Sequence, residues 1–239
     1  LVVIFAIIAL GVGGFFGYTY LANREAAPTT LTPVTMPQPT VQVPSPQPTT
    51  PSVSVGNTVA NHTSLLRKKT DATVALTFGQ IAGELKTQYQ INREALAKVP
   101  TSAKVIEIVP RTLEGEVLSF PGYLNEIGAN TLLPSVVFTD YVEPDFTMIA
   151  VQQPSTFDAA YVLKLREGVN WLFASPELSK LETQPGLDNL FLQLPGSRGA
   201  FIDETIEEQN IRVATYEQPA GALLYGWFRD RLIIATSRD

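Results

Sequence analysis

The chain has one histidine and no cysteine, which limits the chemistry that its side chains can perform. His62, the only imidazole, lies at the end of a Pro-rich stretch. A Ser-His-Asp or Cys-His centre needs a base held beside its nucleophile, and zinc centres need several His or Cys ligands. Because a His in a linker is poorly placed for either, we expect no catalytic residue, metal or cofactor, and a protein that is not an enzyme.

Two groups of acidic residues are the other candidates for chemistry. Asp140, Glu143 and Asp145 crowd one segment, and hard cations such as Ca²⁺ bind to oxygens of this kind. Their spacing does not match an EF-hand loop, so a solvated loop is the alternative. The second group, near the C-terminus, is predicted to be a solvated turn and consists of Asp203, Glu204, Glu207 and Glu208.

Two short segments bear a weaker likeness to reactive motifs. Ser102-Ala103-Lys104 has the residue types of a Ser-Lys dyad, and the polar loop Gly196-Ser-Arg-Gly199 has those of an anion-binding turn. The loop lacks the P-loop pattern, and the chain contains no GxGxxG or GxSxG motif. Ordinary turns are therefore the expected reading of both segments.

Charge is distributed unevenly along the chain. Residues 1–70 carry four Lys and Arg against one Glu, a net charge of +3, whereas residues 71–239 carry 13 Lys and Arg against 22 Asp and Glu, a net charge of −9. Nucleic acid and anionic membrane surfaces repel an acidic domain. We therefore expect no nucleic-acid partner.

Residues 1–22 contain no charged side chain and are followed by Arg24. As a helix they would span roughly 33 Å at about 1.5 Å per residue, close to the hydrocarbon thickness of a bilayer, and Tyr18 and Tyr20 fall where aromatic side chains favour the interface. The segment predicts one transmembrane helix in contact with the lipid bilayer. A cleaved signal peptide ending near Ala26 is the alternative.

Small residues repeat along one face of this predicted helix. Ala9, Gly13 and Gly17 are four positions apart, and such a face lets two helix backbones approach closely. The pattern predicts helix pairing and hence a homodimer. The alternative is that glycine is simply common in membrane helices.

Residues 23–70 are rich in Pro and Thr and have no acidic or basic residue between Glu25 and Arg67. Proline fixes φ and removes a backbone donor, so the stretch is predicted to be a disordered or polyproline-like tether. Forty such residues reach roughly 120 Å when extended and about 35 Å as a flexible coil. Because a tether of this kind is more usual outside the cell, we expect a single-pass protein of the cell membrane with an extracytoplasmic C-terminal domain.

Residues 71–239 are expected to form one α+β domain, with helices packed on a largely antiparallel sheet. A capping box at Thr77 and Gln80 predicts a helix that ends before Pro100. The central elements resemble a ferredoxin-like plan and comprise strands at 104–109, 117–120, 146–151 and 160–165 and helices at 121–128 and 169–181. A β-meander is predicted for the C-terminal third, at 200–203, 211–216, 223–228 and 232–236.

The C-terminal portion resembles domains of membrane-anchored proteins from uncharacterised small-genome bacteria. The likeness lies in AYVLKL (Ala160–Leu165), FLQLPG (Phe191–Gly196), Arg212 and the closing GALLYGWFRDRLIIATS. The resemblance implies one N-terminal membrane helix, a variable tether and an extracytoplasmic domain. It implies no activity and transfers no functional residue.

These features predict a cell-envelope protein whose tethered domain binds another protein or an envelope polymer. One alternative is an inner-membrane assembly-platform subunit of a type IV pilus or type II secretion machine, which also joins one membrane helix to a ferredoxin-like periplasmic domain. Such subunits usually carry a coiled-coil connector, where this chain has a Pro-rich tether. An envelope hydrolase is the second alternative.

Overall fold

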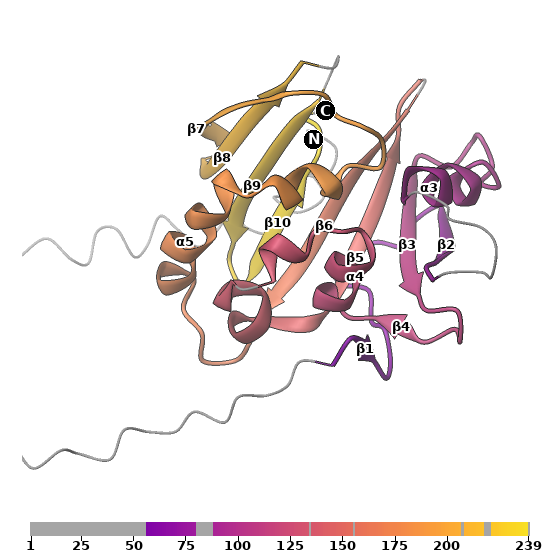
Figure 1. Cartoon of the computed structure of the whole chain (residues 1–239), viewed down its shortest axis with the longest axis horizontal. Coiled ribbons are helices and arrows are strands. Elements are labelled where there is room, and N and C mark those ends of the chain that lie inside the picture. Colours follow the sequence, from indigo (N-terminus) through magenta and orange to yellow (C-terminus); the bar gives the residue numbers. More distant parts are fainter. Residues whose placement is uncertain are drawn as a thin grey trace, which may run out of the picture.

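The computed structural model describes residues 56–79, 88–133, 135–154, 156–206, 208–217 and 221–238. These residues form a large, mostly antiparallel sheet with a few helices packed on it (Figure 1). The predicted α+β class is therefore confirmed. The predicted membrane helix and most of the predicted tether lie outside the described residues, among which no helix is long and apolar enough to cross a membrane.

Five strands make up the N-terminal part of the sheet. The edge strand β1 (Thr58–Val59) pairs antiparallel with β4 (Val117–Leu118), which pairs antiparallel with β3 (Val105–Arg111). β3 also pairs with the long strand β5 (Val142–Gln152) in antiparallel orientation and with β2 (Ala72–Thr77) in parallel orientation. The β2–β3 pair is the one parallel contact in the described part of the sheet.

The C-terminal part of the sheet is an antiparallel meander that starts from β6 (Phe157–Leu165). β6 pairs with β5 and with β10 (Arg231–Ala235), and β10 pairs with β9 (Ala222–Phe228). β8 (Gln209–Tyr216) and the edge strand β7 (Arg198–Ile206) complete the order β1-β4-β3-β5-β6-β10-β9-β8-β7. The predicted meander is confirmed, because its alternating apolar residues and its turns are local features of the sequence.

The predicted capping box at Thr77 is wrong. Thr77 is the last residue of β2 and pairs with Arg111, and Gly79 has a φ of +128°, which no helical residue adopts. The predicted helical periodicity is real further along the chain, where α3 (Gln88–Leu96) lies between β2 and β3. No strand was predicted at Ala72–Thr77, whose last residue was assigned to a helix cap.

The strand order does not follow the predicted ferredoxin-like plan. That plan contains split β-α-β units, in which another strand lies between the two parallel ones. Here β4 and β5, which flank α4 (Phe120–Glu126), both pair antiparallel with β3, so they run parallel to each other with β3 between them. The strand between them is therefore one that precedes the unit, whereas the ferredoxin-like plan places the strand after β5 there; the next strand instead pairs on the other side of β5. Sequence order alone does not distinguish these two arrangements.

The helices α4 and α5 (Trp171–Ser179) lie on the same face of the sheet (Figure 1). Phe120 of α4 packs its ring 5.1 Å from that of Phe138 and 5.0 Å from that of Phe146 of β5. This face holds the main core. Short helical turns complete the layer at Asn130–Leu132, Val137–Tyr141, Lys180–Thr183 and Pro185–Leu190.

Two tyrosines join the helical layer to the sheet inside the main core. Tyr123 of α4 donates a hydrogen bond to Tyr161 of β6 over 3.1 Å, and Tyr161 donates to the carbonyl of Leu190 over 2.6 Å. Both hydroxyls are fully buried, and burial raises the pKa of each tyrosine above its usual value. The chain of donors satisfies these polar groups within an apolar core.

The opposite face of the sheet carries a second apolar cluster. Part of its cover comes from the strap, which we define as residues 60–66 between β1 and β2, because Leu65 and Leu66 pack against this cluster. The strap therefore connects the N-terminal edge of the domain to the far side of the sheet. The buried members of the second cluster are Ile149, Ala160, Val162, Ile211, Val213, Ala222, Leu224 and Ala235.

The folded domain begins before the predicted tether boundary at residue 70. The Ser119 hydroxyl donates to the carbonyl of Gly56 over 2.8 Å, and the Ser119 backbone N–H donates to that of Asn57 over 2.9 Å. Ser119 also caps α4 by accepting from the N–H of Gly122. A Cβ at Gly122 would stand 2.1 Å from the Asn57 carbonyl oxygen, so only glycine allows this approach.

Candidate functional site

His62 lies on the sheet, so the prediction that it belongs to the tether is wrong. Its Nδ1 is 2.7 Å from Asp145 Oδ1 on β5, and its Nε2 is 3.4 Å from Glu107 Oε1 on β3. The side chain is 14% exposed. Backbone bonds hold the strap in register, because the Thr63 N–H donates to Asp145 Oδ2 and the Leu65 N–H donates to Thr147 Oγ1.

The contacts of His62 indicate a positively charged ring. A neutral imidazole has one N–H, whereas the imidazolium has two, and here both nitrogens face carboxylate oxygens. The hydrogen bond to Asp145 raises the pKa of His62 above its ordinary value, against the opposing effect of burial. The geometry therefore favours the imidazolium form of His62 between Asp145 and Glu107.

This arrangement differs from a hydrolytic or metal centre. Both ring nitrogens of His62 are engaged by acids, so neither is left to accept a proton from a Ser or Thr hydroxyl. Asp145 is directed to His62, while Asp140 is exposed. In the part of the chain that the structure describes, no three His, Asp or Glu residues are grouped to hold a metal, which leaves the Ca²⁺ hypothesis for Asp140, Glu143 and Asp145 without a ligand set.

Residues of the second acidic group form ion pairs at the edge of the meander. Asp203 pairs with Arg212 over 2.9 Å, and Glu204 pairs with Arg238 over 2.6 Å. Glu208 has a φ of +65° and lies in the turn between β7 and β8, and Glu207 lies outside the described residues. Through these ion pairs, β7 is joined to β8 and to the residues that follow β10.

The two weaker candidate motifs lie in connections. Lys104 precedes β3, and its backbone N–H donates to Asp71 Oδ2 over 2.7 Å, while Ser102 lies in the turn before it. At the first position of β7, Arg198 lies 3.3 Å from Asp188 Oδ1 and donates to the carbonyl of Gln184. The guanidinium of Arg198 thus binds Asp188 and the Gln184 carbonyl within the domain.

An ion-pair network that the sequence did not reveal joins the helical layer to the meander. Arg212 of β8 binds Glu182 through two bonds of 2.7 Å, and Tyr225 of β9 donates to the same carboxylate over 2.5 Å. Burial alone would raise the pKa of Glu182, but the bonds from Arg212 and Tyr225 outweigh it and lower this pKa. Arg212 therefore joins β8 to the helical turn Lys180–Thr183.

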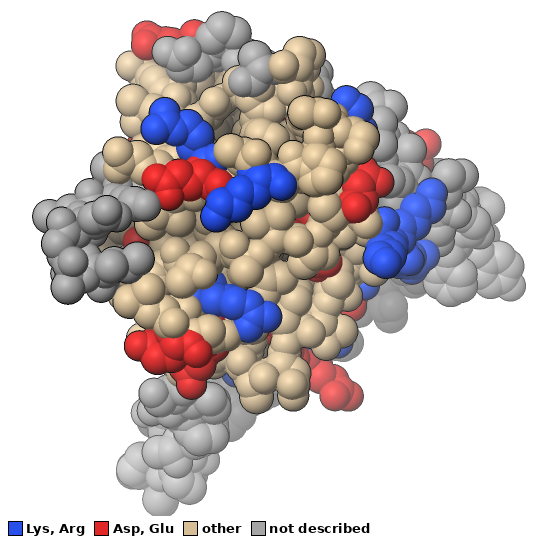
Figure 2. Space-filling model, turned by 90° about the vertical axis from the view of Figure 1, so that its right-hand side faces the viewer, with Lys and Arg blue, Asp and Glu red and all other residues tan. Residues whose placement is uncertain are grey.

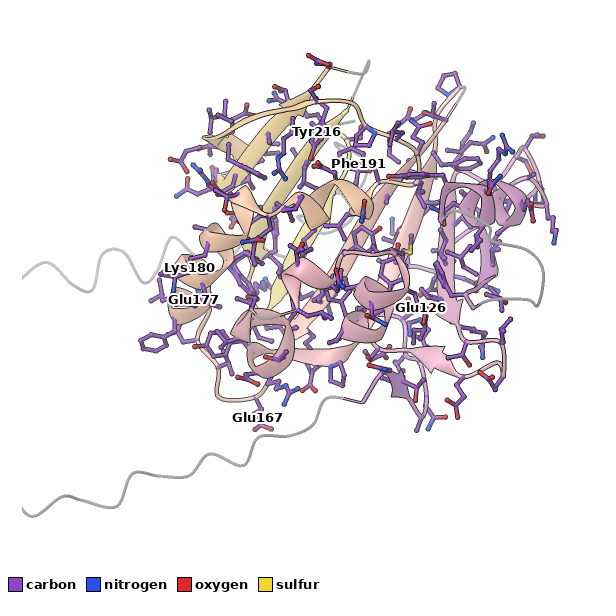
Figure 3. All side chains as sticks on the ribbon, viewed as in Figure 1. Glu126, Glu167, Glu177, Lys180, Phe191 and Tyr216 are labelled. Atoms are coloured by element: carbon purple, nitrogen blue, oxygen red, sulfur yellow. The ribbon has the colours of Figure 1, made fainter. Side chains whose placement is uncertain are left out.

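A second joint connects the same two layers further along the meander. Tyr216 of β8 donates to Asp188 Oδ1 over 2.6 Å, and its ring packs edge-on against that of Phe191 at a centroid distance of 4.7 Å. Figure 3 shows Phe191 and Tyr216 next to each other, between the helical turns and the sheet. The contacts of Glu182 and those of Asp188 therefore both attach the helical layer, which includes α5, to the sheet.

The most unusual surface feature is the apolar tip, which we define as Trp171, Leu172 and Phe173. Their exposed fractions are 43%, 57% and 73%. They form the first turn of α5, where the Asn170 side chain caps the helix by accepting from the Leu172 N–H over 2.9 Å. Three large apolar side chains in succession are thus exposed at one helix end.

The rest of α5 shows why the tip projects. Ala174 and Leu178 are buried and attach the helix to the body of the domain. Glu177 and Lys180 form an ion pair of 2.6 Å on the outer side of the molecule (Figure 3). Three consecutive residues of a helix point in directions about 100° apart, so they cannot all face one core. Three consecutive large apolar residues in a predicted helix were therefore the sequence signal that could have revealed the exposed tip.

The charged residues that Figure 2 shows are of both signs and lie among uncharged surface. Acidic and basic side chains alternate over this face, with no broad region of a single sign in the view. The face offers no extended charged surface for a polyanion or polycation, so the apolar tip is the more distinctive candidate for binding.

Ala9, Gly13 and Gly17, the predicted helix-pairing residues, lie outside the described residues. Comparison with protein-family models, curated proteins and solved structures found no match to this chain. The function must therefore be argued from the residues and contacts of the domain itself.

Proposed function

We propose that this chain is a single-pass, membrane-anchored protein of the cell envelope whose extracytoplasmic domain binds a protein or an envelope polymer through the apolar tip. The exposed Trp171, Leu172 and Phe173 carry this proposal. Complete burial of one such side chain contributes about 1.5–3 kcal/mol. Aromatic side chains are also enriched among the few residues that dominate the energy of protein interfaces.

The shape of the tip suggests the kind of surface that receives it. Because Trp171, Leu172 and Phe173 point about 100° apart, a partner must surround the helix end to bury all three. A flat surface would bury one or two of them. The fitting partner therefore offers an apolar pocket, with polar groups at its rim near Glu177 and Lys180.

The membrane attachment in this proposal rests on the composition of residues 1–22 and on the resemblance of the C-terminal portion to membrane-anchored domains of small-genome bacteria. Residues 23–55 would link the anchor to β1. As a flexible coil, these residues span about 30 Å on average, and they reach roughly 100 Å when extended. The domain would search for its partner within this distance of the bilayer.

Binding fits the described domain better than either alternative. An envelope hydrolase needs convergent catalytic groups, and the imidazole of His62 is engaged by Asp145 and Glu107. An assembly-platform subunit is expected to have a ferredoxin-like domain, and the position of β3 between β4 and β5, where that plan places a later strand, departs from it. Neither alternative accounts for the exposed apolar tip.

Site-specific photocrosslinking in native membranes tests the proposal. We expect a photoreactive residue at Phe173 to form a defined adduct with a protein partner, and Trp171→Ser to remove that adduct. For a polymer ligand, the full chain should sediment with isolated cell-wall material, and Trp171→Ser should reduce the sedimented fraction. A photoreactive residue at Ile202, 51% exposed on the edge strand β7, is the matched control.

The outcomes separate binding from anchoring. A Phe173 probe that gives neither an adduct beyond the Ile202 control nor Trp171-dependent sedimentation would disprove binding through the tip. A full chain that alkaline carbonate releases from membranes would instead disprove the membrane anchor. Since the two readouts are independent, either half of the proposal can fail alone.

A further inference from the structure

We propose that the strap is a pH-sensitive cover of the second apolar face of the sheet, held closed by the imidazolium of His62 and released as the pH rises. This inference goes beyond the proposed function and does not depend on it. It concerns residues 60–66 and the three strands, β3, β5 and β10, whose residues bond to them.

The strap is fastened to the sheet by contacts that converge on a short stretch. His62 bridges Asp145 of β5 and Glu107 of β3, and the Thr63 N–H adds a second bond to Asp145 over 2.9 Å. One further bond comes from Thr147 Oγ1, which accepts from the Leu65 N–H over 2.7 Å. Arg231 of β10 donates to the Leu65 carbonyl over 2.5 Å. Three different strands therefore hold the strap.

The ends of the strap are held separately from its middle. Before it, β1 pairs with β4, and after it, β2 pairs with β3 along its whole length. Release of His62 would therefore open the middle of the strap like a loop attached at both ends. Leu65 and Leu66 would leave the second cluster, and the sheet residues beneath them would be uncovered.

The closed state requires the charged ring. Asp145 and Glu107 approach His62 from two strands, and Arg231, the cation from β10, binds a backbone carbonyl. Within the chain that follows the strap, the nearest charges are the exposed cations of residues 67–69. When His62 is neutral, one ring nitrogen presents a lone pair to a carboxylate oxygen, so one contact becomes repulsive.

The direction of the pH effect follows from the pKa of His62, which the Asp145 hydrogen bond raises above 6.5. A group whose pKa is higher in the closed state than in the open state stabilises the closed state fully below the open-state value. This stabilisation is lost as the pH rises through the closed-state pKa. The strap is therefore closed in mildly acidic solution and loosens in alkaline solution.

A single histidine makes the test direct. The full chain, purified without a histidine tag in detergent micelles and labelled with ¹⁵N-histidine, gives imidazole signals from His62 alone. We expect both ring nitrogens to be protonated at pH 6.5 and the titration midpoint to lie above that of a histidine peptide. In Glu107→Gln, the midpoint should shift down, because one carboxylate is removed.

Amide hydrogen exchange of the strap provides the second readout. In the wild type, the protection factors of residues 62–66, corrected for intrinsic exchange, should fall as His62 loses its proton. In His62→Gln they should be low at every pH, whereas Glu204→Gln, which alters a distant ion pair, should behave as the wild type does. Protection that is independent of pH, or an ordinary His62 midpoint in the wild type, would overturn the proposal.

Discussion

Arg212 and Glu182 face each other in a two-bond ion pair, with Nε–Oε1 and Nη2–Oε2 distances of 2.7 Å. Their side chains are 28% and 16% exposed, so water screens the pair less than at an open surface. Tyr225 donates to the same carboxylate. The pair fixes the helical turn after α5 to the meander, and with it the end of the helix that carries the apolar tip.

Replacement of Arg212 by Lys should destabilise the domain by about 2 kcal/mol, because an ammonium group keeps the charge but cannot make both bonds to Glu182. Urea unfolding of the full chain measures this difference. Arg238→Lys, at the more exposed pair with Glu204, should cost at most about 0.5 kcal/mol. Equal losses in the two variants would show that the two-bond geometry is unimportant.

Acid should weaken the same contact. The pKa of Glu182 is lowered in the folded state, so the stability that this carboxylate contributes is present above its unfolded value, near 4.5, and is lost as the pH falls through the folded value. Glu182→Gln should therefore reduce the loss of unfolding free energy between about pH 6 and about pH 3. A variant with the wild-type pH profile would contradict this assignment.

Gly122→Ala should displace the segment before β1. The added methyl group would stand 2.1 Å from the Asn57 carbonyl oxygen, and we expect a destabilisation of about 2–3 kcal/mol with faster amide exchange at residues 57–59. Gly115→Ala is the control, because Gly115 has a φ of +87° but open space around it. That change should cost about 1 kcal/mol and leave residues 57–59 protected.

The apolar tip should contribute little to folding. Since Phe173 is 73% exposed, Phe173→Ser should alter the unfolding free energy by less than about 0.5 kcal/mol, whereas Leu178→Ala, at a buried position of the same helix, should cost about 3 kcal/mol. Thermal and urea unfolding check both values. A large loss in Phe173→Ser would assign the tip to the fold and remove the main support for binding.

Gly13→Ile and Gly17→Ile should abolish self-association of the predicted membrane helix. A large side chain at either position would prevent the close backbone approach that a small-residue face permits. A membrane reporter assay of residues 1–22 measures the association. Phe15→Ile, about 160° around the predicted helix from Gly13 and Gly17, is the control. An unchanged signal in the glycine variants would eliminate the predicted homodimer contact.

Strands of the C-terminal half could be predicted because their signals are local. In β9, Tyr225 and Trp227 face the main core while Leu224 and Phe228 face the second cluster, as their alternation indicates. In β10, the consecutive residues Ile233 and Ile234 are both buried, as expected of a strand that is covered on both faces. These assignments need only the period of the strand and the turn residues that bound it.

It was harder to infer from the sequence which strands pair with each other in the sheet. The parallel pairing of β2 with β3 depends on where the chain returns after α3, and the pairing of β3 with β5 depends on the chain crossing over β3 between β4 and β5. A ferredoxin-like order has similar local elements. Because the choice among strand orders is made by packing across the whole sheet, residue patterns within each element leave it open.

Composition, charge and periodicity thus sufficed to predict an acidic α+β domain that follows an apolar segment and a Pro-rich segment. The site around His62 was decided by tertiary structure, since Asp145 lies 83 residues and Glu107 lies 45 residues from it along the chain. The same isolated histidine would be solvated in a linker, but here two strands bring carboxylates to both of its nitrogens. Its charge is therefore a property of the folded sheet, because only folding brings these three side chains together.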